Sequence, residues 1–245
     1  MQIICRIHAI KFCLFCEKIM KPIAHIADKE IISIPVKECG EELIDLKNQN
    51  IIVYGPPPET PLTANDYTKI RKTVYQKLCL AQNDLPNGWR FRLYEGLRSL
   101  TVQEILFNQQ RDNLRQSKQY DSYEDLFNET CRLVSPVVHL DGTANIPPHS
   151  TGAAIDIELI DSYGNLVNLG MAAKDWLIVD PDLSETYSKL ISEEAMQNRI
   201  LMLKIMAKHG FVNYPREWWH FSYGDRLWAY MTEHSTAIYG AIINN

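Results

Sequence analysis

The stretch Ala154-Ile-Asp-Ile-Glu-Leu-Ile160 decides the fold that we expect from this sequence. Apolar residues alternate with Asp156 and Glu158 along it, which is the period of a β-strand with one face toward a core. Residues 161–165 then have the composition of a turn, and residues 166–169 supply a second short apolar run. The pattern predicts a hairpin of antiparallel strands in the middle of the chain.

A further strand and three helices are predicted before this hairpin. Phe91 and Leu93 alternate with Arg92 and Tyr94, which indicates a strand within residues 90–97. Apolar residues at three- and four-residue steps predict an amphipathic helix from Asn65 to Leu80. Capping-box patterns predict two more helices, one from Thr101, with Glu104, to about Arg115, and one from Ser122, with Asp125, to a point before Pro136.

One helix and one strand are predicted after the hairpin. Ser192 is placed to cap a helix over residues 193–208 that ends at Gly210, and four apolar residues are expected on its inward face, namely Met196, Ile200, Leu203 and Ala207. An aromatic strand is expected over residues 218–223. Helices, a hairpin, a helix and a last strand predict an α+β fold, with a small antiparallel sheet flanked by helices.

Composition limits the partners of the protein. The 245 residues are 46% hydrophobic, which is normal for a packed globular protein, and the net charge of −5 gives no basic surface for nucleic acid. No run of eighteen apolar residues predicts a membrane span. The six cysteines are unevenly spaced, so we expect reduced thiols and a cytoplasmic location, with the periplasm left open.

The N-terminal residues are set apart from the rest. We interpret residues 1–20 as a poorly ordered extension and residues 21–245 as one domain. Cys13 and Cys16 form a C-x-x-C, but no second cysteine or histidine pair follows at the spacing of a zinc finger. We therefore expect two apolar thiols there, without a metal.

The candidate chemistry lies in two short segments. His149 precedes the central strand, Asp156 lies within it, and Glu217-Trp-Trp-His220 supplies an acid and an imidazole three residues apart. Catalytic zinc takes three nitrogen or oxygen ligands and keeps a fourth position for water, and His149, Asp156 and His220 make such a set. Glu217 is the candidate base for that water. In a regular strand Glu217 and His220 would point to opposite faces, so we expect a local irregularity after Pro215.

Together these segments show a family resemblance. The run from His149 to Asp156, followed by Glu217-Trp-Trp-His220, resembles the S-x-H-x-x-G-x-A-x-D and E-x-W-H-type signatures of the bacterial D-alanyl-D-alanine dipeptidases. These are zinc D,D-peptidases that share a fold with the hedgehog signalling domain. The resemblance implies one Zn²⁺ on His149, Asp156 and His220, Glu217 as general base, and a small dipeptide, D-Ala-D-Ala, as substrate.

The resemblance implies roles for two more residues. Arg98 matches an arginine that steadies the developing oxyanion, although taken alone it could be a surface charge or a structural ion pair. Asp175 matches an acid that receives the ammonium group of the substrate, although it could instead serve only a turn. Pro147 replaces the serine of the family pattern, so we expect altered recognition near the amino end of the substrate.

Two alternative functions stay open on the sequence. A D,D-carboxypeptidase acting on peptidoglycan stem peptides would use the same residues but needs an open cleft. A non-catalytic zinc-stabilised binding module would need neither Glu217 nor Arg98, because a purely structural zinc site closes its fourth position. Hydrolysis of the dipeptide, which would deplete a cell-wall precursor or recycle wall fragments, is the prediction that uses all of these residues.

Overall fold

The computed structural model of the chain describes residues 25–58 and 61–243. The proposed extension over residues 1–20, with Cys13 and Cys16, lies outside the described residues. No helix of the described part of the chain combines the length and the hydrophobicity that a membrane crossing requires.

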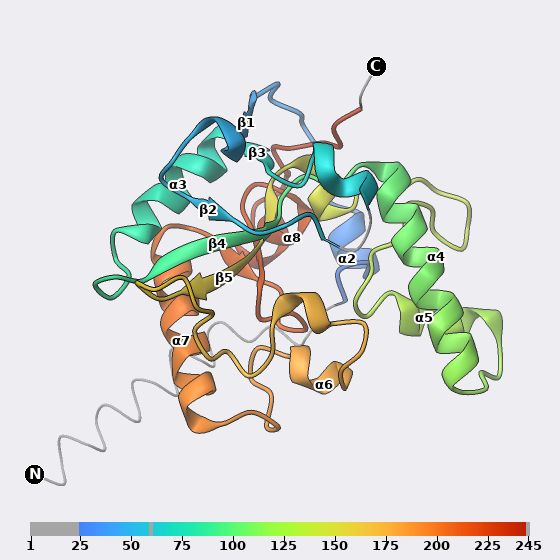
Figure 1. Cartoon of the computed structure of the whole chain (residues 1–245). Coiled ribbons are helices and arrows are strands. Elements are labelled where there is room, and N and C mark those ends of the chain that lie inside the picture. The colour runs from blue at the N-terminus through green and yellow to red at the C-terminus, as the bar shows by residue number, and fades with distance from the viewer. Residues whose placement is uncertain (1–24, 59–60, 244–245) are drawn as a thin grey trace, which may run out of the picture.

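A five-stranded sheet lies at the centre of the molecule (Figure 1). Its order is β2-β4-β5-β7-β6, and β2 pairs with β4 in parallel while the other neighbours are antiparallel. A separate antiparallel pair joins β1 to β3. The strands are β1 Leu43–Asp45, β2 Val53–Tyr54, β3 Lys69–Arg71, β4 Arg90–Glu95, β5 Ala154–Ile160, β6 Val212–Asn213 and β7 His220–Ser222.

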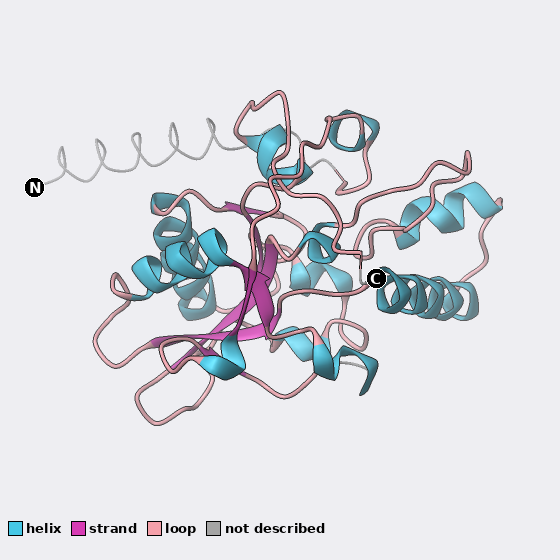
Figure 2. Cartoon of the chain, turned by 90° about the horizontal axis from the view of Figure 1, so that it is seen from above, coloured by secondary structure: helices cyan, strands magenta, loops and turns pink. Residues whose placement is uncertain are grey.

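Helices cover this sheet, which confirms the predicted α+β class (Figure 2). Apolar side chains of α3 and α7 share the main core with those of β4, β5 and β7, whereas α4 and α5 pair with each other and have a smaller core of their own. The α-helices are α2 Lys29–Ile32, α3 Lys72–Gln82, α4 Leu100–Ser117, α5 Tyr123–Thr130, α6 Pro181–Ser184, α7 Glu193–Lys208 and α8 Arg226–Met231. The 3-10 turns are η1 Leu46–Asn48, η2 Pro61–Asn65, η3 Pro148–Thr151 and η4 Ala173–Asp175.

The central strand β5 is buried along its whole length. Ile155, Ile157 and Leu159 lie in the main core, as their alternation predicts. The acidic side chains of Asp156 and Glu158 are buried as well, so the second face of the strand is also covered. Buried carboxylates need partners or a cation, and this face of β5 is therefore where a functional site is expected.

Several predicted elements need correction. The helix predicted from Asn65 begins only at Lys72, because Ile70 pairs with Ile44 in the small sheet. Residues 166–169 do not form a full strand after the turn, since Leu166 makes a single bridge to Ile160. The strand expected within 90–97 ends at Glu95, and of the strand expected over 218–223 only His220–Ser222 forms. The strand over 154–160 and the helix over 193–208 are confirmed.

Two details of the predicted helices are also wrong. The side chain that caps α4 is Ser99, which accepts a hydrogen bond from the Val102 amide, and not Thr101. On α7 the buried residues are Ala195, Arg199, Met202, Ile205 and Met206, so the buried face is turned by about one residue from the predicted one. The Ser122 cap of α5 and the Ser192 cap of α7 are confirmed.

Candidate metal centre

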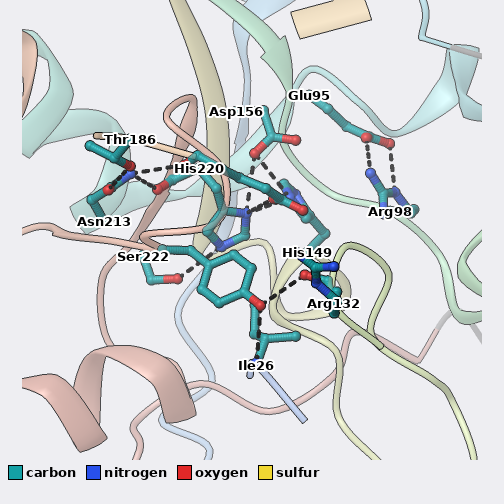
Figure 3. Close-up of polar contacts among 12 residues, drawn as sticks. Ile26, Glu95, Arg98, Arg132, His149, Asp156, Thr186, Asn213, His220 and Ser222 are labelled. Atoms are coloured by element: carbon teal, nitrogen blue, oxygen red, sulfur yellow. Dashed lines mark hydrogen bonds and ion pairs between the residues drawn. The ribbon is translucent and has the colours of Figure 1, made fainter. Parts of the chain in front are cut away.

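Three side chains from three separate elements converge beside β5. His149 lies in η3, Asp156 in β5 and His220 at the start of β7, and Asp156 and His220 are direct partners in the antiparallel register. The Asp156 Oδ1 atom is 3.3 Å from His149 Nε2 and 3.2 Å from His220 Nδ1, and the two nitrogens are 3.2 Å apart. The cluster is buried, with at most 6% of each residue exposed (Figure 3).

The near-equilateral triangle of these atoms fits a tetrahedral metal ion. Ligand atoms about 2.0–2.1 Å from a tetrahedral Zn²⁺ lie roughly 3.3–3.4 Å from one another, close to the spacings found here. Asp156 Oδ1 is buried without a hydrogen-bond partner, which is costly for a carboxylate oxygen unless a cation meets it. Within the described residues, His149, Asp156 and His220 are the group able to hold a metal ion.

Hydrogen bonds on the far side of each imidazole orient the rings. His149 Nδ1 lies 2.8 Å from the Gly96 carbonyl oxygen, and His220 Nε2 lies 3.3 Å from Ser222 Oγ. A proton on each of these nitrogens leaves His149 Nε2 and His220 Nδ1 free to bind a cation, as is usual for histidine ligands. Sequence reasoning missed both partners, because one is a backbone carbonyl and the other an ordinary strand serine.

The segment before β7 is not a strand, and this resolves the expected conflict between Glu217 and His220. The Glu217 amide donates to the Tyr214 carbonyl and the His220 amide to the Glu217 carbonyl, at 2.9 and 3.1 Å, so two successive turns precede the strand. Glu217 Oε2 consequently lies 3.6 Å from His220 Nδ1, on the side of the triangle. The irregularity expected after Pro215 is confirmed.

The charges of the cluster favour an unusual protonation of Glu217. Burial raises the pKa of this carboxyl group well above its usual range, the Asp156 carboxylate raises it further, and Arg98 opposes both. Burial would also raise the pKa of Asp156, but the two neighbouring imidazoles outweigh it and hold that pKa well below the usual range. The cluster thus keeps Asp156 as the anion, while Glu217 is the group with the stronger tendency to hold a proton.

Arg98 lies at the edge of the same site and is held in place. Its Nε atom donates to Glu95 Oε1 at 3.0 Å, its Nη2 atom to Glu95 Oε2, and its Nη1 atom to Gln103 Oε1 at 3.0 Å. Glu95 is fully buried, and 11% of the Arg98 side chain remains exposed. Sequence reasoning missed Glu95, although a carboxylate at the end of a predicted strand, three residues before an arginine, is a usable signal.

A narrow cavity of about 40 Å³ opens onto the triangle. Arg98 and Glu217 line it with the three candidate ligands, and its remaining wall is largely apolar, formed by residues such as Tyr94, Val134 and Trp219. Asp175 is not among its lining residues, whereas the adjacent Trp176 is. Pro147 comes directly before η3, and Pro148 contributes to the wall.

Comparison with known sequences identifies the family of the chain. The family model described as D-ala-D-ala dipeptidase, Peptidase M15, matches residues 62–239, well over half of the chain. The protein belongs to that family, and the resemblance found in its two motifs is confirmed.

Individual relatives agree with the family. The chain is 29% identical to the D-alanyl-D-alanine dipeptidase of Synechocystis over 82% of its own length and 90% of that protein's. It is 29% identical to the D-alanyl-D-alanine dipeptidase of Enterococcus faecalis over 55% of its length and 62% of that protein's. Among solved structures, that of the LdcB LD-carboxypeptidase aligns with 83% of this chain and 82% of the LdcB chain, with 14% sequence identity and a TM-score of 0.42.

Proposed function

We propose that this peptidase is a zinc-dependent dipeptidase that hydrolyses D-alanyl-D-alanine. The observation that carries the proposal is the triangle of His149, Asp156 and His220, with ligand spacings suited to one tetrahedral ion and with Glu217 beside it. The names of the family and of its relatives supply the substrate.

Each residue of the site has a task in this proposal. A zinc ion held by the three ligands would polarise the peptide carbonyl and lower the pKa of a water molecule toward about 7. The Glu217 carboxylate accepts a proton from water and passes it to the leaving amine, which its raised pKa favours. Arg98, fixed by Glu95, places a permanent positive charge at the edge of the site, where an oxyanion can be stabilised.

Any peptide substrate requires the cavity to widen. Its volume of about 40 Å³ has room for only a few water molecules, so even a dipeptide requires side chains of the wall to move aside. A peptidoglycan stem peptide would require a larger opening. The names of the family and of its relatives support a dipeptidase over the D,D-carboxypeptidase alternative, and the paired presence of Glu217 and Arg98 supports an enzyme over a binding module.

Asp175 remains the proposed counter-charge for the substrate ammonium group. It ends η4, and the next residue, Trp176, lines the cavity, so binding of the ammonium group by Asp175 requires this turn to rearrange. Asp175→Asn should raise KM for D-Ala-D-Ala and leave kcat nearly unchanged. An unchanged KM would remove Asp175 from substrate binding.

The test of the function uses the purified full-length chain. Metal analysis should find one zinc per chain, and incubation with D-Ala-D-Ala should release free D-alanine, with L-Ala-L-Ala as the stereochemical control. Turnover of a stem pentapeptide ending in D-Ala-D-Ala, without turnover of the free dipeptide, would assign the carboxypeptidase instead. Bound zinc with no turnover of either peptide would favour the binding module.

A further inference from the structure

One asparagine side chain ties together both ends of the segment that carries Glu217 and His220. Asn213 lies in β6, and its Nδ2 atom donates to the Glu217 carbonyl oxygen at 3.0 Å and to the His220 carbonyl oxygen at 2.9 Å. Figure 3 shows Asn213 beside His220, on the side away from Arg98. The two hydrogen atoms of a single planar amide therefore fix the separation of two backbone carbonyls three residues apart.

A second side chain fixes the orientation of that amide. Thr186 Oγ1 donates to Asn213 Oδ1 at 2.6 Å, and Thr186 is 2% exposed. Because the Oδ1 atom is occupied by this donor, the NH₂ group must face the two carbonyls. The oxygen and the NH₂ group of the Asn213 amide are thus both paired, and a fully paired, partly buried network of this kind holds its side chains in one orientation.

The segment that holds Thr186 runs directly beside the Glu217 turn. The Thr186 amide donates to the Pro215 carbonyl, and the Trp218 amide donates to the Ser184 carbonyl, both at 2.9 Å. We call residues 184–186 the brace segment. Its backbone is thus bonded to the turn both before and after Glu217.

The brace segment is itself anchored to α7. Arg199 of α7 donates to the Glu185 and Leu183 carbonyls at 2.6 and 3.0 Å, and its guanidinium lies 5.2 Å from the ring centroid of Trp218. Arg199 is 1% exposed. A chain of partly buried polar contacts therefore leads from α7, through the brace segment and Asn213, to the candidate base and one candidate ligand.

We propose that Asn213, oriented by Thr186, is a positioning residue that sets the distance between the Glu217 carboxylate and the His220 imidazole. The inference rests on the proposed function, and it goes beyond it because Asn213 is neither a candidate metal ligand nor a residue that lines the cavity. Without the shared amide, the two carbonyls would lose their common donor, and the turn could relax toward a strand, which places the two side chains on opposite faces.

The experiment compares variants of nearly unchanged shape. Asn213→Asp removes the two donors and sets a carboxylate against two carbonyl oxygens. Thr186→Val removes the hydroxyl donor, whereas Thr186→Ser keeps it. The matched control is Asn198→Asp in α7, where the lost donor also served a carbonyl, that of Asn168 at 2.9 Å, away from the site. Each protein is titrated with Zn²⁺ and with Co²⁺, whose absorption spectrum reports ligand geometry.

Loss of the shared amide should weaken metal binding and catalysis together. We expect a Zn²⁺ dissociation constant about 10–100-fold higher in Asn213→Asp, as for other supports of metal ligands, with a smaller rise in Thr186→Val. The Co²⁺ spectrum should change, and kcat for D-Ala-D-Ala should fall with little change in KM. Thr186→Ser and Asn198→Asp should match the wild type in every readout.

Several results would overturn the inference. A folded Asn213→Asp protein with the wild-type Zn²⁺ affinity, Co²⁺ spectrum and kcat would do so. If Asn213→Asp does not fold, Thr186→Val decides by the same readouts, and wild-type behaviour there counts against the role. A wild type that binds metal but does not turn over dipeptide would contradict the proposed function alone, because the Co²⁺ spectra still test the positioning. A wild type that binds neither metal would overturn both.

Discussion

Among the described residues, the Asp156 Oδ1 atom gives the strongest support for the proposed cation site. It is buried and accepts no hydrogen bond, and it lies 3.3 Å from His149 Nε2 and 3.2 Å from His220 Nδ1. Desolvating an ionised carboxylate without a partner carries a large free-energy cost. A metal ion would remove this cost in the folded state only, so metal binding and folding stability should be linked.

Zinc should therefore stabilise the folded protein. At a free Zn²⁺ concentration about 100-fold above its dissociation constant, the free energy of unfolding should rise by about 2.7 kcal/mol. For a chain of this size that corresponds to an increase in Tm of roughly 5–10 °C, measured by calorimetry with and without a chelator. Asp156→Asn, which keeps the shape of the side chain but removes the charge, should lose most of the increase; an equal increase in that variant would place the metal elsewhere.

Glu217 should be needed for hydrolysis but not for metal binding. Its carboxylate is 3.6 Å from His220 Nδ1 and is not part of the ligand triangle, so Glu217→Gln should keep the zinc content of the wild type. Loss of the base should lower kcat by about 10³-fold or more, which corresponds to about 4 kcal/mol of transition-state stabilisation. Zinc analysis and release of D-alanine measure the two effects separately, and unchanged turnover would remove Glu217 from the mechanism.

At the scale of single elements, the residue that caps α4 can be identified by substitution. Ser99 accepts from the Val102 amide, and Thr101 lies inside the helix. Ser99→Ala should lower the free energy of unfolding by about 1 kcal/mol, and Thr101→Ala should change it much less. Urea denaturation of both variants measures the difference, and equal losses would show that the capping bond contributes little.

Gly96, directly after β4, lies where the backbone approaches the candidate site closely. Gly96 accepts from His149, and a Cβ atom on it would lie 2.6 Å from Ile70 Cγ2 and 2.7 Å from the Lys69 carbonyl oxygen. Gly96→Ala should thus cost about 1–3 kcal/mol in stability and weaken metal binding by displacing the His149 acceptor. Gly55→Ala is the matched control, because nothing there lies closer than 3.7 Å to the added carbon. If Gly96→Ala bound the metal as tightly as the wild type, the hydrogen bond between His149 and the Gly96 carbonyl would not be needed to orient His149.

The sequence predicts those elements whose pattern is local. The strand 154–160 and the Ser192 cap are local features, and so are the short motifs that carry the three candidate ligands. The buried face of α7 is not a local feature, because apolar residues occur on more than one side of this helix. The contact that decides its orientation is made by Arg199, which donates to backbone carbonyls that precede the helix in the sequence. Glu95, Asn213 and Ser222 likewise gain their roles only from residues that folding brings beside them.

At the scale of the whole molecule, Arg71 connects distant parts of the chain. This 2% exposed residue donates to Glu38, to the Thr151 carbonyl at the end of η3, and to the Gly240 carbonyl near the C-terminal end of the described residues. The segment before β1, the turn that carries His149 and the C-terminal segment therefore meet at one guanidinium. Loss of the Glu38 carboxylate should therefore lower the free energy of unfolding of the protein.

Acid should weaken this connection. Burial alone would raise the pKa of Glu38, but hydrogen bonds from the Gly240 and Gly40 amides and the charge of Arg71 outweigh it and lower that pKa. A carboxylate with a lowered pKa adds stability above its usual pKa, and this stability is lost as the pH falls through the folded value. Glu38→Gln should thus be less stable than the wild type at neutral pH, and the difference should shrink by about pH 3. Urea denaturation at both values measures it, and a pH-independent difference would assign the loss to shape and not to charge.

The burial of β5 on both faces has a consequence for dynamics. Asp156 stands on the strand with neighbours on each side in the sheet, so its backbone is exposed to solvent only when the entire domain opens. Amide hydrogens around Asp156 should accordingly be among the slowest in the protein to exchange with deuterium, with or without a chelator. The candidate metal site would then be a preformed cage, and an ion could enter or leave through side-chain motion while the backbone stays closed.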